Sequence, residues 1–166
     1  MICRLVLGCA LVLWAVPAAA TDRAAIDGLV SQHAKANGVP EALVHRIIAR
    51  ESGYDPRAAR GGNFGLMQIR FETARGMGYT GSASGLLDAN TNLTYAVPYL
   101  ANAYKVAGGD HARAVTLYAG GYYYVAKRKG LLKELRTGAS APVSAEAVWS
   151  SPIPVHAAVF TPAGSR

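Results

Sequence analysis

The chain has 166 residues, with 17 Lys or Arg against 10 Asp or Glu, and its formal net charge is +7 at pH 7. This length suits one domain and excludes two globular domains. Hydrophobic residues make up 51% of the sequence and charged residues 16%, and much of the apolar excess lies in the first twenty residues.

The N-terminal segment has the layout of a secretory signal peptide. Arg4 precedes an apolar run over residues 5–16, and Pro17 and several alanines follow it. The run is shorter than the ~20 apolar residues that a spanning helix needs, and the small residues after it resemble a cleavage site. We therefore predict a signal peptide over residues 1–20 and a periplasmic or secreted protein without stable membrane insertion. The stretch ending at Cys9 also resembles a lipoprotein cleavage box, so lipidation is the alternative.

Because the protein is predicted to be exported, its basic charge indicates different binding partners than it would in the cytoplasm. Outside the cytoplasm the expected polyanions are cell-wall polymers and anionic membrane surfaces, so nucleic acid is not an expected partner. Both cysteines, Cys3 and Cys9, lie in the predicted signal, so the mature chain is expected to have no disulfide and no thiolate site. The basic run over residues 127–129 indicates a solvated helix face, with contact to an anionic wall as the alternative.

Apolar residues recur at helical spacing over residues 22–136, which predicts one helical domain there. The expected helices cover residues 23–36, 40–52, 72–77, 91–107, 111–119 and 122–135. Residues 65–69 are the one candidate for a short extended segment. The fold class is therefore mainly α, with little or no β-structure. Residues 137–166 are rich in Ala, Pro, Ser and Val, which predicts a disordered tail.

Some single residues refine the expected helix ends. Asp22, Asp88 and Asp110 stand where N-caps are expected, because their side chains can accept from the first free backbone N–H groups. Gly53 suits a left-handed cap after the second helix. Pro98 is expected to kink the helix over 91–107 or to start its second half.

Glu51 breaks the apolar pattern of the second helix. Val44, Ile47 and Ile48 precede it by seven, four and three residues, so the helical period places a carboxylate on the apolar stripe. Burial and the negative end of the helix dipole both favour its neutral, protonated form. A protonated carboxyl can donate to a leaving oxygen when a glycosidic bond is cleaved. The alternative is a solvated helix-end glutamate, or one paired with Arg46, Arg50 or Arg57.

Four groups of residues follow one another along the chain in an order that is typical of one protein family. They are Glu51-Ser52 with Tyr54 and Asp55-Pro56, then Gly65-Leu66-Met67-Gln68-Ile69 with Thr73-Ala74, then Asn92-Leu93 with Tyr99-Leu100, and last Tyr118-Ala119-Gly120-Gly121. In this order and spacing they resemble the soluble lytic transglycosylase (SLT) family, over roughly residues 26–130. The resemblance implies a lysozyme-like single helical domain.

The resemblance also implies a reaction. Members of that family cleave the β-1,4 bond between MurNAc and GlcNAc in peptidoglycan without water. Glu51 matches the family's glutamic acid, which protonates the departing oxygen and then takes a proton from the C6 hydroxyl as a 1,6-anhydro ring closes. The N-acetyl group of the substrate stabilises the developing cation, so no second carboxylate is needed. The implied enzyme is a carbon–oxygen lyase acting on a polysaccharide.

Five further residues are candidates for substrate binding, each with a structural alternative. Gln68 and Tyr118 match cleft residues of the family, but Gln68 can instead tie the glycine loop together and Tyr118 can pack in the core. Asn63 stands in a loop where relatives usually carry a serine, and can replace it as a polar partner. Ser52 can instead support the helix end, and Gly65 can allow close backbone approach.

The chain also departs from the family pattern. Ala119 stands where the common Tyr-Asn-Ala-Gly turn has its amide, Phe71 replaces a usual proline, and Arg70 replaces a frequently apolar residue. These departures bear on rate and substrate positioning more than on fold or reaction class.

Other chemistries are not indicated. The four histidines lack ligand spacing, and no phosphate-loop or Ser-His-Asp pattern is present, so neither a metal nor another cofactor is expected. The leading hypothesis is a peptidoglycan lytic transglycosylase whose partners are glycan strands. An envelope-spanning secretion system is a second hypothesised partner. The alternatives are a hydrolytic muramidase on the same fold and a non-catalytic wall-binding component of such a system.

Overall fold

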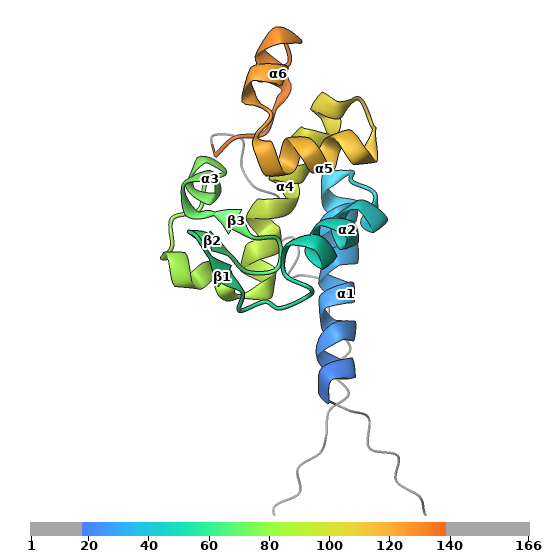
Figure 1. The fold of residues 1–166 in the computed structure, drawn as a ribbon, viewed down its shortest axis with the longest axis vertical. Helices are drawn as coiled ribbons and strands as arrows, with labels where there is room; N and C mark the ends of the chain where they lie inside the picture. Colours follow the sequence, from blue (N-terminus) through green and yellow to red (C-terminus); the bar gives the residue numbers. More distant parts are fainter. Residues whose placement is uncertain (1–17, 139–166) are drawn as a thin grey trace, which may run out of the picture.

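The computed structural model describes residues 18–138 (Figure 1). The described chain forms six α-helices, two 3-10 helices and a sheet of three two-residue strands. In chain order these are α1 (Ala18–Asn37), α2 (Glu41–Glu51), β1 (Ala59–Arg60), β2 (Asn63–Phe64), β3 (Ile69–Arg70), α3 (Phe71–Gly76), η1 (Ala83–Leu87), α4 (Ala89–Ala107), α5 (His111–Gly120), α6 (Tyr123–Arg128) and η2 (Leu132–Glu134). The mainly α, lysozyme-like fold with little β-structure is confirmed.

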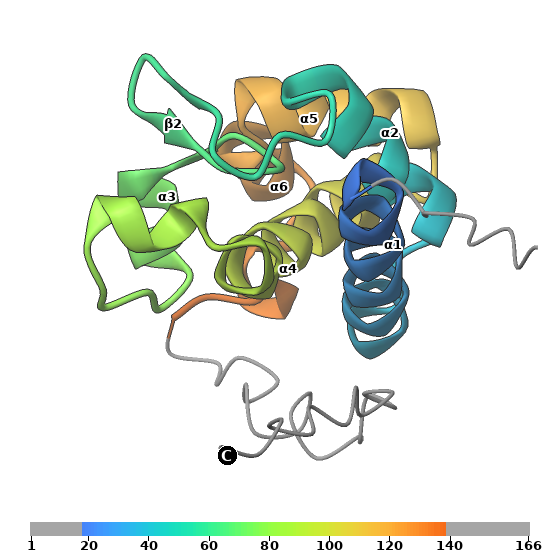
Figure 2. The same cartoon turned by 90° about the horizontal axis from the view of Figure 1, so that it is seen from below.

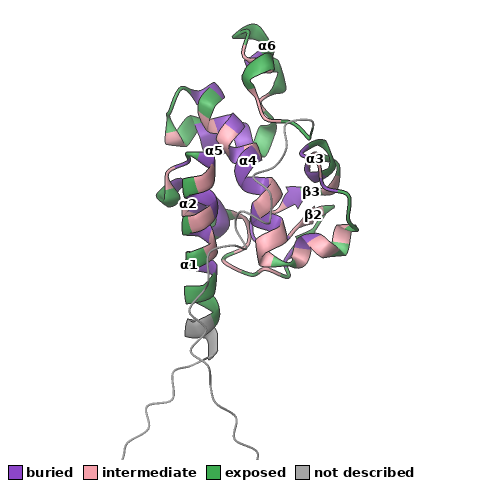
Figure 3. Cartoon of the chain, turned by 180° about the vertical axis from the view of Figure 1, so that it is seen from behind, coloured by how far each residue is buried: buried purple, intermediate pink, exposed green. Residues whose placement is uncertain are grey.

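Helix α4 is the centre of the fold. It packs against α5 and α1, and α2 packs against α1. The small sheet and α3 lie on one side of α4, and α1 lies on the other (Figure 2). Leu93 and Leu100 of α4 are fully buried, and buried residues are concentrated along α4 and the neighbouring faces of α2 and α5 (Figure 3). Each such side chain contributes roughly 1.5–3 kcal/mol of hydrophobic free energy.

Helix α2 follows its sequence pattern closely. Pro40 is the N-cap, and Leu43, Val44, Ile47 and Ile48 are all buried. Proline suits this position because the first-turn N–H groups have no partner in the helix. The chain leaves the helix through Gly53, whose φ of 61° is in the left-handed region. The buried stripe fixes the rotation of α2 and therefore the direction in which its last residue, Glu51, points.

The small antiparallel sheet has the order β1-β2-β3. Ala59 pairs with Phe64, and Phe64 pairs with Ile69. Of the three strands, only β3 overlaps the extended segment predicted over residues 65–69, because β1 and β2 precede that segment. Gly61 and Gly62, with φ values of 56° and 81°, make the turn between β1 and β2.

Two of the three predicted N-caps are confirmed. Asp88 accepts from the Thr91 N–H at 2.7 Å, and Asp110 accepts from the Arg113 N–H at 2.7 Å. The prediction for Asp22 is wrong, because α1 begins at Ala18 and Asp22 lies inside it. Residues 1–17 of the predicted signal and residues 139–166 of the predicted tail lie outside the described residues.

The helix expected over residues 122–135 is wrong. Helix α6 ends at Arg128, and η2 covers only Leu132–Glu134. Gly130 interrupts the helix with a φ of 70°, a left-handed conformation that ends helices. Pro98, in contrast, lies inside one uninterrupted helix, α4. None of the helices in residues 18–138 is long and apolar enough to cross a membrane.

Candidate active site

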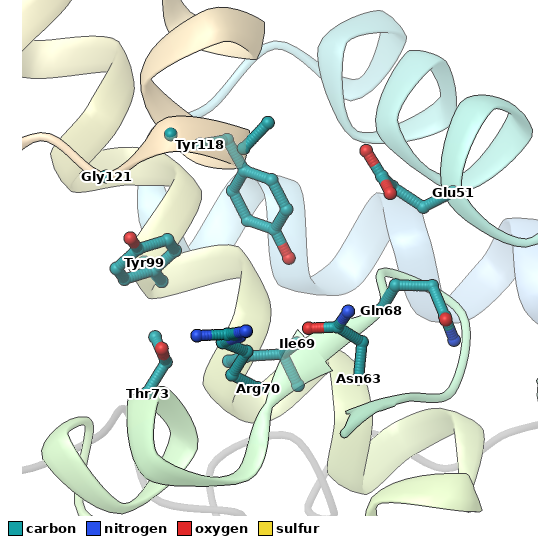
Figure 4. Close-up of a pocket in the computed structure, with 11 residues that line it drawn as sticks. Glu51, Asn63, Gln68, Ile69, Arg70, Thr73, Tyr99, Tyr118 and Gly121 are labelled. Atoms are coloured by element: carbon teal, nitrogen blue, oxygen red, sulfur yellow. The ribbon is translucent and has the colours of Figure 1, made fainter. Parts of the chain in front are cut away.

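A cleft of about 550 Å³ opens between the end of α2, the sheet and the end of α5. Four of the six candidate site residues line it, namely Glu51, Asn63, Gln68 and Tyr118. Figure 4 shows them converging from α2, from the sheet and its loop, and from α5. Segments far apart in the sequence therefore line one cleft.

Glu51 is the last residue of α2, and its side chain is 24% exposed. Its carboxylate points into the cleft on the side of Tyr118 (Figure 4). Arg50 Nε lies 3.6 Å from Glu51 Oε1, but the Arg50 side chain is 55% exposed. A solvated pair of this kind is worth at most about 1 kcal/mol. Glu51 is therefore paired with Arg50, as the alternative proposed, but its carboxylate still lies in the cleft.

Tyr118 is buried and also lines the cleft. Its Oη donates to the Met67 carbonyl at 2.9 Å, and its ring meets the Tyr99 ring edge-on with centroids 5.4 Å apart. Burial, followed by the negative charge of Glu51, raises the pKa of Tyr118 well above its usual value. The phenol is thus neutral at physiological pH, and its hydroxyl is directed at the loop that carries Gln68.

The Gln68 side chain ties that loop together. Its Nε2 donates to the carbonyls of Ala58 and Gly65, both at 2.9 Å. Its own φ is 47°, a left-handed conformation that costs a non-glycine residue about 1–2 kcal/mol. The two hydrogen bonds offset this cost. Gln68 therefore ties the glycine loop together, as its structural alternative states, and it also lines the cleft.

Ser52 and Gly65 do not line this cleft. Ser52 Oγ donates to the Leu66 carbonyl at 2.7 Å, which joins the end of α2 to the loop. Gly65 has a φ of 67°, and a Cβ there would lie 2.3 Å from the Leu86 carbonyl oxygen and 2.4 Å from Asn92 Nδ2. Both residues hold the loop in place, and a direct contact with substrate stays a prediction for each.

Asn92 is the residue whose importance the sequence least revealed. It is fully buried in α4, where its Oδ1 accepts from the Met67 N–H at 2.9 Å. Its Nδ2 donates to the carbonyls of Phe64 at 2.8 Å and Leu86 at 2.9 Å. One side chain thus joins α4, η1 and the loop between β2 and β3. The sequence placed Asn92 in a motif but assigned it no role.

The opposite wall adds residues that were not predicted as site residues. Arg70, Thr73 and Tyr99 line the cleft. In β3, Ile69 is buried and Arg70 is exposed, so the alternation of a strand was the available signal for Arg70. Within residues 18–138, no group of three or more His, Cys, Asp or Glu side chains is placed to hold a metal ion.

A second hollow of about 450 Å³ continues the cleft toward α6 and η2. Thr73, Tyr99 and Gly121 line both hollows. Tyr122 packs against Tyr99 with ring centroids 4.7 Å apart, whereas Tyr123 is 56% exposed at the edge of this hollow. Aromatic side chains therefore line both the cleft and its continuation toward α6.

We expect Tyr118→Phe to separate the support of the loop from the packing of the ring. The variant keeps the buried ring but removes the hydroxyl that donates to the Met67 carbonyl. One such hydrogen bond contributes about 1 kcal/mol, so urea unfolding should show a loss of that size together with lower activity. Tyr104→Phe, at a half-buried position of α4 that does not line the cleft, is the matched control. An unchanged midpoint for Tyr118→Phe would contradict this role.

A family model described as the transglycosylase SLT domain matches residues 28–138. The match covers more than half of the chain and all four motifs, and the chain belongs to this family. Membership confirms the resemblance and assigns the chain to the transglycosylases that act on peptidoglycan. The comparison with solved structures returned no significant match.

Proposed function

We propose that the protein cleaves the MurNAc–GlcNAc β-1,4 bond of peptidoglycan without water and leaves 1,6-anhydro-MurNAc ends. The observation that carries this proposal is the position of Glu51. Of the described residues that line the cleft, Glu51 is the only carboxylate, and the rotation of α2 directs it inward. A single carboxyl group, buried over about three quarters of its side chain, is what a reaction with one acid–base residue requires.

The steps balance with this one group. Protonated Glu51 donates to the glycosidic oxygen, the bond from MurNAc C1 to that oxygen breaks, and the GlcNAc hydroxyl leaves. The carbonyl oxygen of the MurNAc N-acetyl group bonds to C1 and holds the positive charge. The Glu51 carboxylate then takes the proton of the C6 hydroxyl, O6 bonds to C1, and the acetyl oxygen leaves. Glu51 ends protonated, and no water is consumed.

Tyr118 supports these steps by position. Since burial and the charge of Glu51 keep its phenol neutral, it does not compete with Glu51 as a base. Its hydroxyl holds the Met67 carbonyl, and the edge of its ring covers part of the cleft beside the carboxylate (Figure 4). It therefore fixes the loop around the place where the substrate would react.

The two alternatives fit this cleft less well. A hydrolytic muramidase usually pairs two carboxylates across the scissile bond, whereas the described cleft residues supply only Glu51. A binding protein without activity would have no use for a carboxyl group that is three-quarters buried at the end of an apolar stripe. We place the reaction in the periplasm or outside the cell, where the wall lies, and fractionation of cells tests this location.

The masses of the products test the reaction. Purified peptidoglycan digested with the protein should release muropeptides with anhydro ends, each one water lighter than a hydrolysed end. Mass spectrometry of the soluble fraction distinguishes the two. Hydrolysed ends would establish the muramidase instead. Binding to the wall without release of fragments would establish a non-catalytic wall protein.

A further inference from the structure

Arg70 is a cation on the wall of the cleft that faces Glu51. It is the second residue of β3, and it is exposed while Ile69 before it is 2% exposed. Figure 4 shows its guanidinium in the cleft beside Thr73, below the rings of Tyr99 and Tyr118. Strand alternation, together with the position of Arg70 as the N-cap of α3, therefore presents this group to whatever occupies the cleft.

Within the described residues, Arg70 has no acidic partner. The other ion pairs of arginine or lysine, Arg23 with Asp27 and Lys105 with Glu134, lie on the surface away from this cleft. In the described part of the chain, Glu51 is paired only with Arg50. Arg70 is also the only cation among the described residues that line the cleft. Its charge is thus left for a ligand.

The guanidinium selects the chemistry of that ligand. Arginine binds carboxylates with two parallel hydrogen bonds, and it remains charged at any pH of interest. The sugar rings of a glycan strand carry only neutral hydroxyl and acetamido groups. The negative charges of peptidoglycan are carboxylates, on the lactyl group of MurNAc where no peptide is attached and on the stem peptide where one is.

We propose that Arg70 is a specificity-determining residue that binds a carboxylate of the bound strand. This inference rests on the proposed function, because it takes peptidoglycan as the occupant of the cleft. It goes beyond cleavage, since it states that acidic strands are preferred over neutral strands of the same sugars. The preference is electrostatic and falls as salt is added.

The test compares Arg70→Gln with Arg113→Gln. Arg113 is exposed on α5 and does not line the cleft, so its variant removes the same charge elsewhere. Three substrates are used: strands with stem peptides, strands freed of peptide so that the lactyl carboxylate is exposed, and peptide-free strands whose lactyl groups are converted to amides. The release of anhydro ends gives KM and kcat for each substrate.

We expect Arg70→Gln to raise KM about tenfold on a carboxylate-bearing strand, which corresponds to about 1.4 kcal/mol. On the amidated strand its KM should match that of the unmutated protein. Arg70→Lys should recover part of the loss, because it keeps the charge but not the fork of two donors. The strand that shows the effect identifies the carboxylate as that of the lactyl group or that of the peptide.

Two outcomes overturn the proposal. One is an equal KM for Arg70→Gln and Arg113→Gln on both acidic strands, and the other is an equal loss on the amidated strand. Sedimentation of the strands with Glu51→Gln and with Glu51→Gln/Arg70→Gln measures the same preference without turnover. If the unmutated protein forms no anhydro ends, the proposed function fails, while this binding measurement still decides the role of Arg70.

Discussion

Glu51→Gln is expected to reduce the release of anhydro-muropeptides by at least ~10³-fold, because a positioned acid–base group supplies roughly 10²–10⁴-fold and here serves both steps. The amide has the shape of the carboxyl group but neither donates nor accepts the proton at the required moment. The fold should be unaffected. The side chain is 24% exposed, and its ion pair with Arg50, at 3.6 Å, is solvated. Initial rates and thermal unfolding measure the two effects.

Glu41→Gln is the matched control for this prediction. It makes the same chemical change at the opposite end of α2, and Glu41 does not line the cleft. Its activity should stay within twofold of the unmutated protein. If Glu51→Gln retained more than about a tenth of the activity, the acid would have to be another group, and the proposed mechanism would be wrong.

Local patterns predicted the elements that depend on local forces. Helix α2 was predicted almost to the residue, since an apolar stripe, a starting proline and a terminal glycine all act within a few turns. The same stripe revealed Glu51, because a carboxylate at that spacing conflicts with its neighbours. The sheet was missed, since two-residue strands are too short to show alternation, and the helix over residues 122–135 was overextended through Gly130.

The site was predicted less fully than the fold because its decisive contacts join distant residues. Tyr118 and Met67 are 51 positions apart, and Asn92 and Met67 are 25 apart. No spacing rule shows which side chain of a motif touches a ligand and which holds the motif in place. Thus Ser52 and Gly65 support the loop below the cleft, and Arg70, named only as a departure from the family pattern, lines the cleft itself.

Asn92→Ala should lower the free energy of unfolding by about 3–5 kcal/mol. The substitution leaves the Met67 N–H and the carbonyls of Phe64 and Leu86 without the partners that they have at 2.8–2.9 Å. A buried polar group that loses its partner costs about 1–3 kcal/mol, and a water molecule entering the vacated space recovers part of the sum. Urea unfolding measures the loss.

Thr91→Ala controls for the helix itself, because Thr91 precedes Asn92 in α4 and is only partly buried. It should change the stability by less than about 0.5 kcal/mol. Asn92→Asp is a second variant that separates the acceptor of this side chain from its donor. A carboxylate keeps an acceptor for the Met67 N–H but supplies no donor for the two carbonyls, so this variant should also be destabilised. A loss below about 1 kcal/mol for Asn92→Ala would show that the loop holds its shape without this side chain.

The two supports of the loop should also be coupled. Asn92 accepts from the N–H of Met67, and Tyr118 donates to the carbonyl of the same residue, so both fix one short segment beside Glu51. Residues that act on one shared element give non-additive losses. In Asn92→Ala/Tyr118→Phe, the Tyr118→Phe change should therefore lower the free energy of unfolding by less than the ~1 kcal/mol expected in the otherwise intact protein. The reason is that the Asn92→Ala change has already displaced the segment that Tyr118 holds. Strict additivity would mean that the two hydrogen bonds hold the loop independently.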